Sequence, residues 1–170
     1  MGLLGRRDDG KTKYQMREKM FSIGDDAWIE DEHGNKVFKV DGKALRMRST
    51  FILEDASGRE VASIQEKMLH IRDTMELERA GNTIATIKKA LISPLRDHYK
   101  VEFAAGGEWD VTGNIVDHEY KIESGRDDVA EVSKKWFRVR DTYGIEVEPG
   151  QDDGLVLAVA VAVDEMRRGD

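Results

Sequence analysis

The stretch FILEDASGREVASIQEKMLHIRD, residues 51–73, decides the fold because its pattern returns along the chain. A strand-like limb ends in a charged turn that contains glycine, a Val/Ile-Ala-x-Val/Ile limb follows, and a short apolar limb closes on Arg-Asp. The pattern recurs at 75–97 and 120–141, and an offset of 24 residues also places eight residues from Ile29 to Arg48 on matching residues of the quoted stretch. A period of this length predicts one supersecondary unit used several times.

The limbs have the alternation that is typical of β-strands. MELE (75–78), YKVEF (99–103) and YKIE (120–123) place apolar side chains on one face and charged side chains on the other. Glycine or asparagine stands at the expected turns, for example at residues 33–35 and 80–82. These residue types adopt positive φ at low cost, so each repeat is predicted to be a hairpin.

Counting hairpins predicts about twelve strands. The count includes an N-terminal strand near residues 14–23 and a last strand at 143–147. It also includes a shortened copy of the repeat at 99–119, with weaker limbs expected at 109–111 and 114–116.

The C-terminal run LVLAVAVAV, residues 155–163, is apolar on all sides. Its Val-Ala alternation is compatible with a strand, but we predict a helix, and a helix of this kind must be buried. Asp152 or Asp153 can cap its start, and Arg167 and Arg168 suit the dipole at its end.

The two predictions support each other. A barrel of about eight strands is filled by its own side chains, whereas one of eleven or twelve leaves room for a helix roughly 10 Å across. We therefore expect a mainly β fold, a closed antiparallel β-barrel of about twelve strands around a buried hydrophobic C-terminal helix. The expected organisation is a flexible N-terminal segment at 1–13 and a single barrel domain at 14–168.

Composition narrows the possible functions. The chain of 170 residues has no cysteine, which excludes disulfides, thiolate metal sites and a cysteine nucleophile. A net charge of −7 argues against broad nucleic-acid binding. The first ten residues have no apolar signal region, and the longest apolar run covers about half of the roughly 20 residues that a membrane span needs. We expect a cytoplasmic protein without a transmembrane span.

No pattern of catalytic or metal-binding residues is present. His33, His70, His98 and His118 are scattered without metal-ligand spacing, so we expect surface or turn roles for them. Asp117-His118-Glu119 is expected to be a polar connection, because no recognisable motif supplies a nucleophile. We predict a protein that is not an enzyme, with no catalytic residue, metal site or cofactor.

The most suggestive surface feature follows from the alternation in the repeats. Burying side chains such as Leu45, Met47 and Val139 turns the intervening arginines outward, with lysines at the preceding turns. This predicts a basic stripe that binds an anion or lipid. Its expected members are Lys43, Arg46, Arg48, Lys67, Arg72, Lys88, Lys89, Arg96, Lys134, Lys135, Arg138 and Arg140. In the alternative interpretation, cross-strand ion pairs neutralise these arginines, with Glu76, Glu78, Glu102 and Glu123 as partners.

Three parts of the chain resemble a known family. GNIVDHEY at 113–120, VSKKWFRVRDTYGIEV at 132–147 and the C-terminus in which two aspartates precede an apolar run resemble the LURP-one-related family. The resemblance implies kinship with the tubby C-terminal domain and the phospholipid scramblases, and so a twelve-stranded barrel enclosing a hydrophobic helix. The tubby relatives suggest phosphoinositide-rich membranes. The cysteine-rich acylation segment of scramblases is absent here, and the resemblance supplies no activity.

The sequence is compatible with three functions. The first is a non-enzymatic binding module whose basic stripe recognises an anionic phospholipid or membrane surface. The second is a structural or protein-interaction scaffold that uses exposed apolar positions such as Trp28 and Ile52. The third, a scramblase-like lipid mover, is disfavoured because the one long apolar segment is needed inside the barrel. The oligomeric state is not predicted.

Overall fold

The computed structural model describes residues 10–17, 26–42, 50–66, 74–90, 97–136 and 142–168 of the chain. In these residues it contains twelve strands and one helix, α1 (Asp153–Arg168). The strands are β1 (Thr12–Arg17), β2 (Asp26–Asp31), β3 (Lys36–Gly42), β4 (Thr50–Asp55), β5 (Glu60–Glu66), β6 (Thr74–Arg79), β7 (Asn82–Lys89), β8 (Asp97–Phe103), β9 (Glu108–Asn114), β10 (Glu119–Ser124), β11 (Asp127–Ser133) and β12 (Thr142–Val147).

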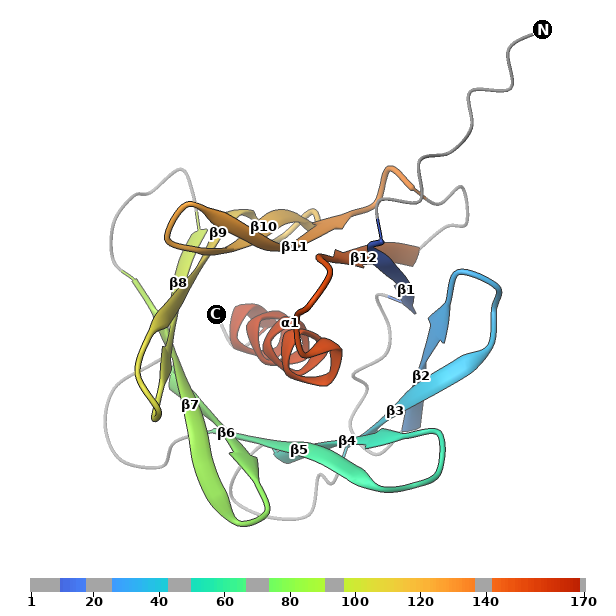
Figure 1. Cartoon of the computed structure of the whole chain (residues 1–170), viewed down its shortest axis with the longest axis horizontal. Helices are drawn as coiled ribbons and strands as arrows, with labels where there is room; N and C mark the ends of the chain where they lie inside the picture. The colour runs from blue at the N-terminus through green and yellow to red at the C-terminus, as the bar shows by residue number, and fades with distance from the viewer. Residues whose placement is uncertain are drawn as a thin grey trace, which may run out of the picture.

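The strands close into one antiparallel barrel around α1 (Figure 1). Each strand from β2 to β11 pairs with its neighbours in sequence, and β1 completes the ring by pairing with β12 over its whole length, from Thr12↔Val147 to Arg17↔Thr142. The seam between β1 and β2 is the shortest ladder between the described strands, with the register pairs Tyr14↔Asp31 and Gln15↔Glu30. The predicted fold class is therefore confirmed.

The first hairpins follow one another at a regular interval. β2, β4 and β6 begin at residues 26, 50 and 74. The turns of the first two hairpins also match in detail, because Gly34 and Gly58 adopt φ values of 82° and 83°. In the second turn the Asp55 carboxylate accepts a hydrogen bond from the N–H of Ser57 at 2.9 Å. The pKa of Asp55 is lowered, mainly because the Ser57 side chain donates a hydrogen bond to this carboxylate.

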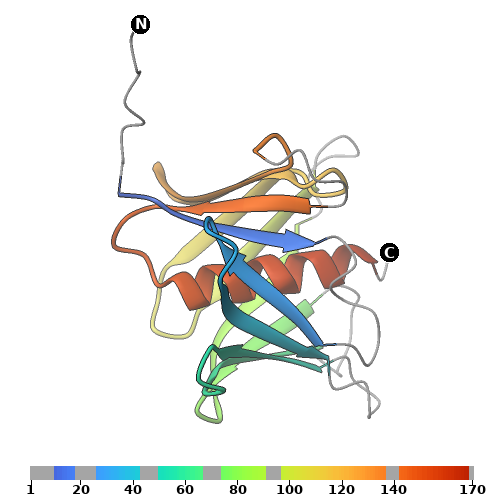
Figure 2. The same cartoon turned by 90° about the vertical axis from the view of Figure 1, so that its right-hand side faces the viewer.

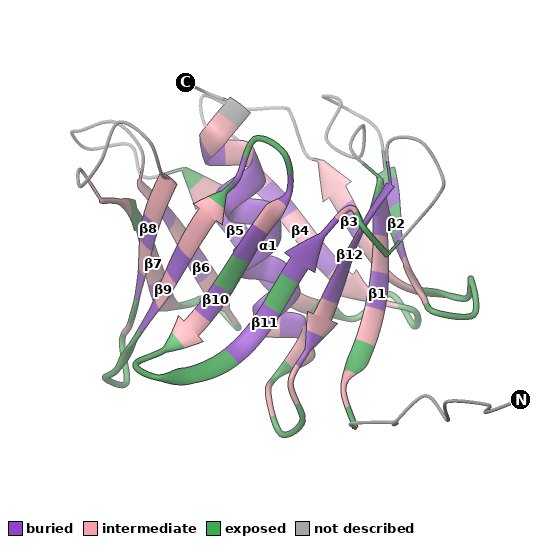
Figure 3. Cartoon of the chain, turned by 90° about the horizontal axis from the view of Figure 1, so that it is seen from above, coloured by how far each residue is buried: buried purple, intermediate pink, exposed green. Residues whose placement is uncertain are grey.

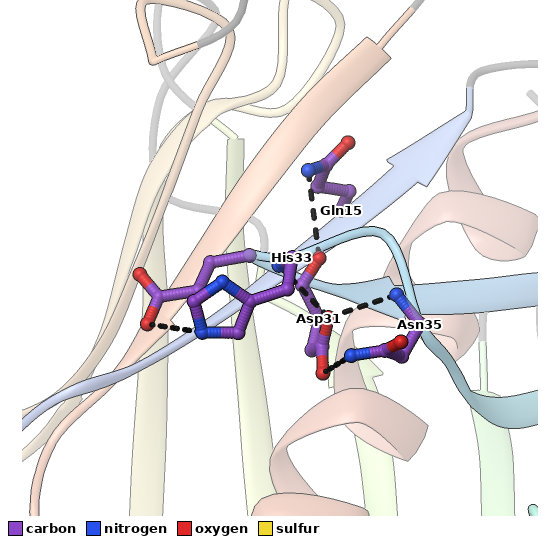
Figure 4. Close-up of polar contacts among 5 residues, drawn as sticks. Gln15, Asp31, His33 and Asn35 are labelled. Atoms are coloured by element: carbon purple, nitrogen blue, oxygen red, sulfur yellow. Dashed lines mark hydrogen bonds and ion pairs between the residues drawn. The ribbon is translucent and has the colours of Figure 1, made fainter.

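The first turn is organised by Asp31 in the same way (Figure 4). One oxygen of its carboxylate accepts hydrogen bonds from the N–H of His33 at 2.8 Å and of Asn35 at 2.9 Å. The Asn35 side chain donates to the other oxygen and is the main cause of the lowered pKa of Asp31. A carboxylate that caps its own turn fixes the hairpin locally, without help from the core.

One predicted strand is absent. Residues 114–116 were expected to form a limb, but Asn114 ends β9 and residues 115–118 form a tight turn into β10. The Asn114 side chain accepts from the N–H of Asp117 at 3.1 Å and donates to its carboxylate at 2.7 Å. Such side-chain bonds compete with the strand ladder and favour a turn. In the expected N-terminal strand, residues 18–23 lie outside the described residues.

The apolar C-terminal run is a helix, as predicted, and it crosses the barrel from one end to the other (Figure 2). Asp152 caps its start, since its carboxylate accepts from the N–H of Leu155 at 3.1 Å and its carbonyl accepts from that of Val156 at 3.0 Å. The Tyr14 hydroxyl donates to the carboxylate of Asp153. The first turn of α1 is thereby hydrogen-bonded to the capping Asp152 and to Tyr14 of β1.

The core lies between α1 and the inner face of the strands (Figure 3). Every residue from Val156 to Val163 is buried, so α1 has no side left for water. Fully burying one Val or Leu side chain contributes about 1.5–3 kcal/mol, and the helix is therefore a large part of the stability of the domain. Gly154 allows close approach at the first turn, because a Cβ there would lie 2.5 Å from Cγ1 of Val61.

The two ends of the barrel differ in their connections. We call the end at which α1 ends the distal end; β3, β5, β7, β9 and β11 end there, and β4, β6, β8, β10 and β12 begin there. The opposite, proximal end carries the start of α1 and the turns between β2 and β3, β4 and β5, β6 and β7, β8 and β9, and β10 and β11. Figure 2 shows β1 pointing to the same end as the C-terminus.

Gly113 provides a test of the close approach between β9 and β10. It has a φ of +139°, and a Cβ there would lie 2.6 Å from the carbonyl oxygen of Glu119 and 2.7 Å from Cα of Tyr120. Backbone cannot give way as a flexible side chain can, so Gly113→Ala is expected to lower the free energy of unfolding by about 1–3 kcal/mol more than Gly34→Ala. Gly34 also has positive φ but open space around it. Equal losses in urea unfolding would contradict this account.

Candidate functional site

Four members of the predicted basic stripe lie in the described residues: Lys88 and Lys89 at the end of β7, and Lys134 and Lys135 just after β11. Since β7 and β11 both end at the distal end, all four lie near that end of the barrel. The other predicted members lie outside the described residues: Lys43, Arg46, Arg48, Lys67, Arg72, Arg96, Arg138 and Arg140.

Lys88 forms a cross-strand ion pair. Its Nζ lies 3.0 Å from a carboxylate oxygen of Glu102 on β8, and both side chains are half exposed. Other ion pairs between strands follow the same pattern, for example Lys100 with Glu108 at 3.3 Å. For Lys88 the structure thus supports the alternative interpretation, in which a glutamate neutralises the basic residue.

Lys134 and Lys135 stand on a turn that Glu119 fixes in place. The Glu119 carboxylate accepts from the Ser133 hydroxyl at 2.8 Å and from the N–H of Lys134 at 3.0 Å. The Ser133 hydroxyl oxygen in turn accepts from the N–H of Lys135 at 3.1 Å. Among the described residues Lys135 makes no ion pair, and its side chain is exposed.

Two large apolar side chains are exposed beside these lysines. Trp136 follows them directly and is 38% exposed, and Val116 in the turn between β9 and β10 is 49% exposed. Both positions lie at the distal end, on neighbouring connections, because β10 pairs with β11 through Tyr120↔Val132. Apolar side chains exposed next to basic residues are typical of a surface that meets a partner.

The apolar positions expected from the sequence differ from these. Trp28 is indeed exposed, on the outer face of β2, and Nζ of Lys36 lies 5.2 Å from its ring centroid in a cation–π arrangement. Ile52 on β4 is partly buried. Trp136 and Val116 were missed, since exposure at the end of a barrel depends on which strands the turns join.

Charge is distributed unevenly between the connections. The four segments 43–49, 67–73, 91–96 and 134–141 contain ten Lys and Arg residues and two Asp, in a chain whose net charge is −7. Each of these segments joins two strands whose adjoining ends lie at the distal end. The ten cations are ten of the twelve predicted stripe residues, the other two being Lys88 and Lys89.

Inside the same end lies a buried polar group, the Asp164 cluster, made of Asp164, His118 and Tyr143. Asp164 is on α1 and is 2% exposed. One of its carboxylate oxygens lies 3.0 Å from Nε2 of His118, and the other accepts from the Tyr143 hydroxyl at 2.8 Å. The rings of His118 and Tyr143 stack with centroids 4.0 Å apart. A carboxylate buried in an apolar core requires such partners, because removing it from water is costly.

His118 was expected to have a surface or turn role. It does lie in the turn between β9 and β10, but its side chain is buried, so a surface role is wrong. The reason is that its ring lies inside the barrel next to Asp164 of α1; its backbone there has a positive φ of 52°. The signal in the sequence was Asp164 itself, a carboxylate that directly follows a run predicted to be buried on all sides.

Two tyrosines lie close to the Asp164 cluster. Burial raises the pKa of Tyr120 well above its usual value, and the nearby Asp164 carboxylate and Tyr99 raise it further. Among the described residues the Tyr120 hydroxyl has no hydrogen-bond partner. The two buried hydroxyls therefore differ in their hydrogen bonding, since that of Tyr143 donates to Asp164 and that of Tyr120 does not.

The chemistry open to these residues is limited. The Asp164 cluster is closed off from solvent, and so is suited to holding elements together. Within the described ranges, no three His, Asp or Glu side chains are grouped as a metal site requires. In that part of the chain, no helix combines the length and apolar character that crossing a bilayer demands.

Comparison with known proteins gives consistent results. A family model described as LURP-one-related matches residues 12–164, from the start of β1 to Asp164. The uncharacterized protein YxjI of Bacillus subtilis (strain 168) is 26% identical over 156 residues, which cover 91% of this chain and 93% of that protein. An X-ray structure of a protein from Arabidopsis thaliana aligns with a TM-score of 0.71 and 20% identity, covering 93% of this chain and 92% of that one. At this identity the structural likeness shows the fold alone.

Two substitutions that each remove one buried hydroxyl test the hydrogen bond to Asp164. Tyr143→Phe takes a donor from a buried carboxylate and is expected to lower the free energy of unfolding by about 1–3 kcal/mol. Tyr120→Phe removes a hydroxyl without a partner among the described residues and is expected to be neutral or stabilising. Urea unfolding at neutral pH measures both. The account is wrong if the two variants lose stability equally.

Tyr120 also predicts an alkaline dependence of stability. Its pKa is raised in the folded state, so the folded chain keeps the proton at pH values where the unfolded chain, with a tyrosine pKa near 10, releases it. The stability is full below about pH 10 and is lost as the pH rises above it. Tyr120→Phe should reduce that loss by up to about 1.4 kcal/mol per pH unit. Parallel stability curves for the two proteins between pH 9 and 11 would contradict the prediction.

Proposed function

The chain belongs to the LURP-one-related family, and from this premise we propose that its barrel is a non-enzymatic binding module that recognises anionic phospholipid at a membrane surface. The proposed contact is the distal end. The observation that carries the proposal is the exposed Trp136 directly after Lys134 and Lys135, on a turn that Glu119 holds at that end.

The charge distribution supports a contact with an anionic surface. In the sequence, ten basic residues of the predicted stripe stand between strands whose adjoining ends lie at the distal end, while the chain as a whole is acidic. A basic residue near an anionic bilayer contributes about 1 kcal/mol, and the attraction falls off within a Debye length.

The exposed apolar side chains support a bilayer over a soluble anion. Tryptophan is enriched at the level of the lipid headgroups, where its ring meets both apolar and polar surroundings. Trp136 and Val116 lie on neighbouring connections of the same barrel end and flank the lysines. A soluble anion would bind the cations without using these apolar groups. Kinship with the tubby and scramblase superfamily, implied by the sequence resemblance, also favours a lipid surface.

A second candidate function is a protein-interaction scaffold, and exposed Trp28 favours it. Its ring lies on the outer face of β2, with Lys36 beside it. A partner bound there would be retained at high salt and lost in Trp28→Ala. Membrane binding through the distal end would instead be lost at high salt.

The membrane proposal predicts the outcome of vesicle flotation. The protein should float with vesicles that contain phosphatidylserine and phosphoinositide but not with phosphatidylcholine alone, and 0.5 M salt should abolish flotation. Lys134→Glu combined with Lys135→Glu should reduce partitioning by at least about tenfold, given the contribution of each basic residue. Trp136→Ala should weaken partitioning with little change in its salt dependence.

The matched control makes the same change of charge at the other end of the barrel. Arg59→Glu with Arg126→Glu alters two arginines in proximal turns and should leave partitioning nearly unchanged. The proposal fails if the wild-type protein ignores both kinds of vesicle, or if the control pair weakens partitioning as much as the Lys134 and Lys135 pair.

A further inference from the structure

We propose that the contact between Asp164 and His118 inside the barrel positions the turn that carries Lys134, Lys135 and Trp136 on its outside. The inner and outer contacts are joined by a single peptide bond, since His118 faces α1 and Glu119 faces the turn after β11. The coupling between the inner and outer contacts does not depend on what the protein binds. Its effect on binding rests on the proposed membrane function.

The inner contact joins three elements that are distant in sequence. Asp164 comes from the last part of α1, His118 from the turn between β9 and β10, and Tyr143 from the start of β12. The His118 Nε2 and the Tyr143 hydroxyl engage different oxygens of the carboxylate, at 3.0 and 2.8 Å. Two directional contacts on one buried carboxylate, plus the stacked rings, fix the place of His118 relative to the helix.

The backbone at His118 supports the same conclusion. Its φ of 52° lies in the left-handed region, which a residue with a Cβ adopts at a cost. Such a conformation persists only where the surroundings hold it. Its N–H donates to the carbonyl of Ile115 at 3.1 Å, and its ring is held by Asp164 and Tyr143. Loss of the ring contacts would release the turn to a more ordinary conformation.

The outer contact begins at the next residue. Glu119 starts β10, and its carboxylate accepts from the Ser133 hydroxyl and the N–H of Lys134. Ser133 then accepts from the N–H of Lys135. A change in the backbone of His118 shifts the Cα of Glu119, and these bonds, which depend on distance and angle, weaken with it. The position of the buried helix therefore determines the position of an exposed turn.

Amide hydrogen exchange, followed by NMR without any lipid, tests the coupling directly. The N–H groups of Lys134 and Lys135 should exchange at least tenfold faster in Asp164→Asn, and also in Tyr143→Phe, which removes one of the two contacts but keeps the carboxylate. The N–H groups of Gly34 and Gly58 report on the proximal end, where they are bonded to the carbonyls of Asp31 and Asp55. Their exchange should stay unchanged.

Tyr120→Phe is the control for a nearby loss of one buried hydroxyl, and it should leave the Lys134 and Lys135 amides unchanged. The proposal is overturned if these amides keep their wild-type rate in a folded Asp164→Asn or Tyr143→Phe protein. It is also overturned if Gly34 and Gly58 accelerate to the same degree, because the effect is then global. Because no vesicle is present, this result is independent of whether the membrane function holds.

Discussion

A helix that is apolar on every side cannot meet water on any of them, and the structure follows from that constraint. Val156 to Val163 are all buried, which requires walls around the whole circumference of α1. A sheet that covers one face of a helix does not satisfy this requirement, whereas a closed ring of strands does. The barrel is as wide as it is because its contents are a helix about 10 Å across rather than side chains alone.

Carboxylates hold the helix at both ends of the ring. At the proximal end Asp152 caps α1 and also pairs with Arg79, with Nη1 and Oδ2 3.0 Å apart. At the distal end Asp164 is bound by His118 and Tyr143. Apolar packing of Val and Ala side chains does not by itself determine the position of a helix along its axis. The polar contacts at the two ends supply that specificity, at the cost of burying one charge.

The parts of the fold that could be predicted from the sequence are those with a local cause. Strand alternation, glycine-containing turns and the apolar run each act within a few residues, and together they predicted the barrel and its helix. The limb expected at 114–116 was wrong because the bond between Asn114 and Asp117 makes a turn where apolar residues suggested a strand. The Asp164 cluster could not be predicted, since closure of the ring brings residues 118, 143 and 164 together. The basic stripe stays a prediction for most of its residues, and the position of Lys88, Lys89, Lys134 and Lys135 near one end depends on topology, which alternation does not contain.

Closure between the first strand and the last also determines the order in which the molecule can be completed. A ribosome releases β1 first, yet its partner β12 and the helix that fills the barrel emerge only after every other strand. For most of synthesis the nascent chain therefore holds hairpins whose apolar faces have nothing to cover them. Surfaces of this kind are prone to aggregate until the sixteen-residue helix α1 covers them.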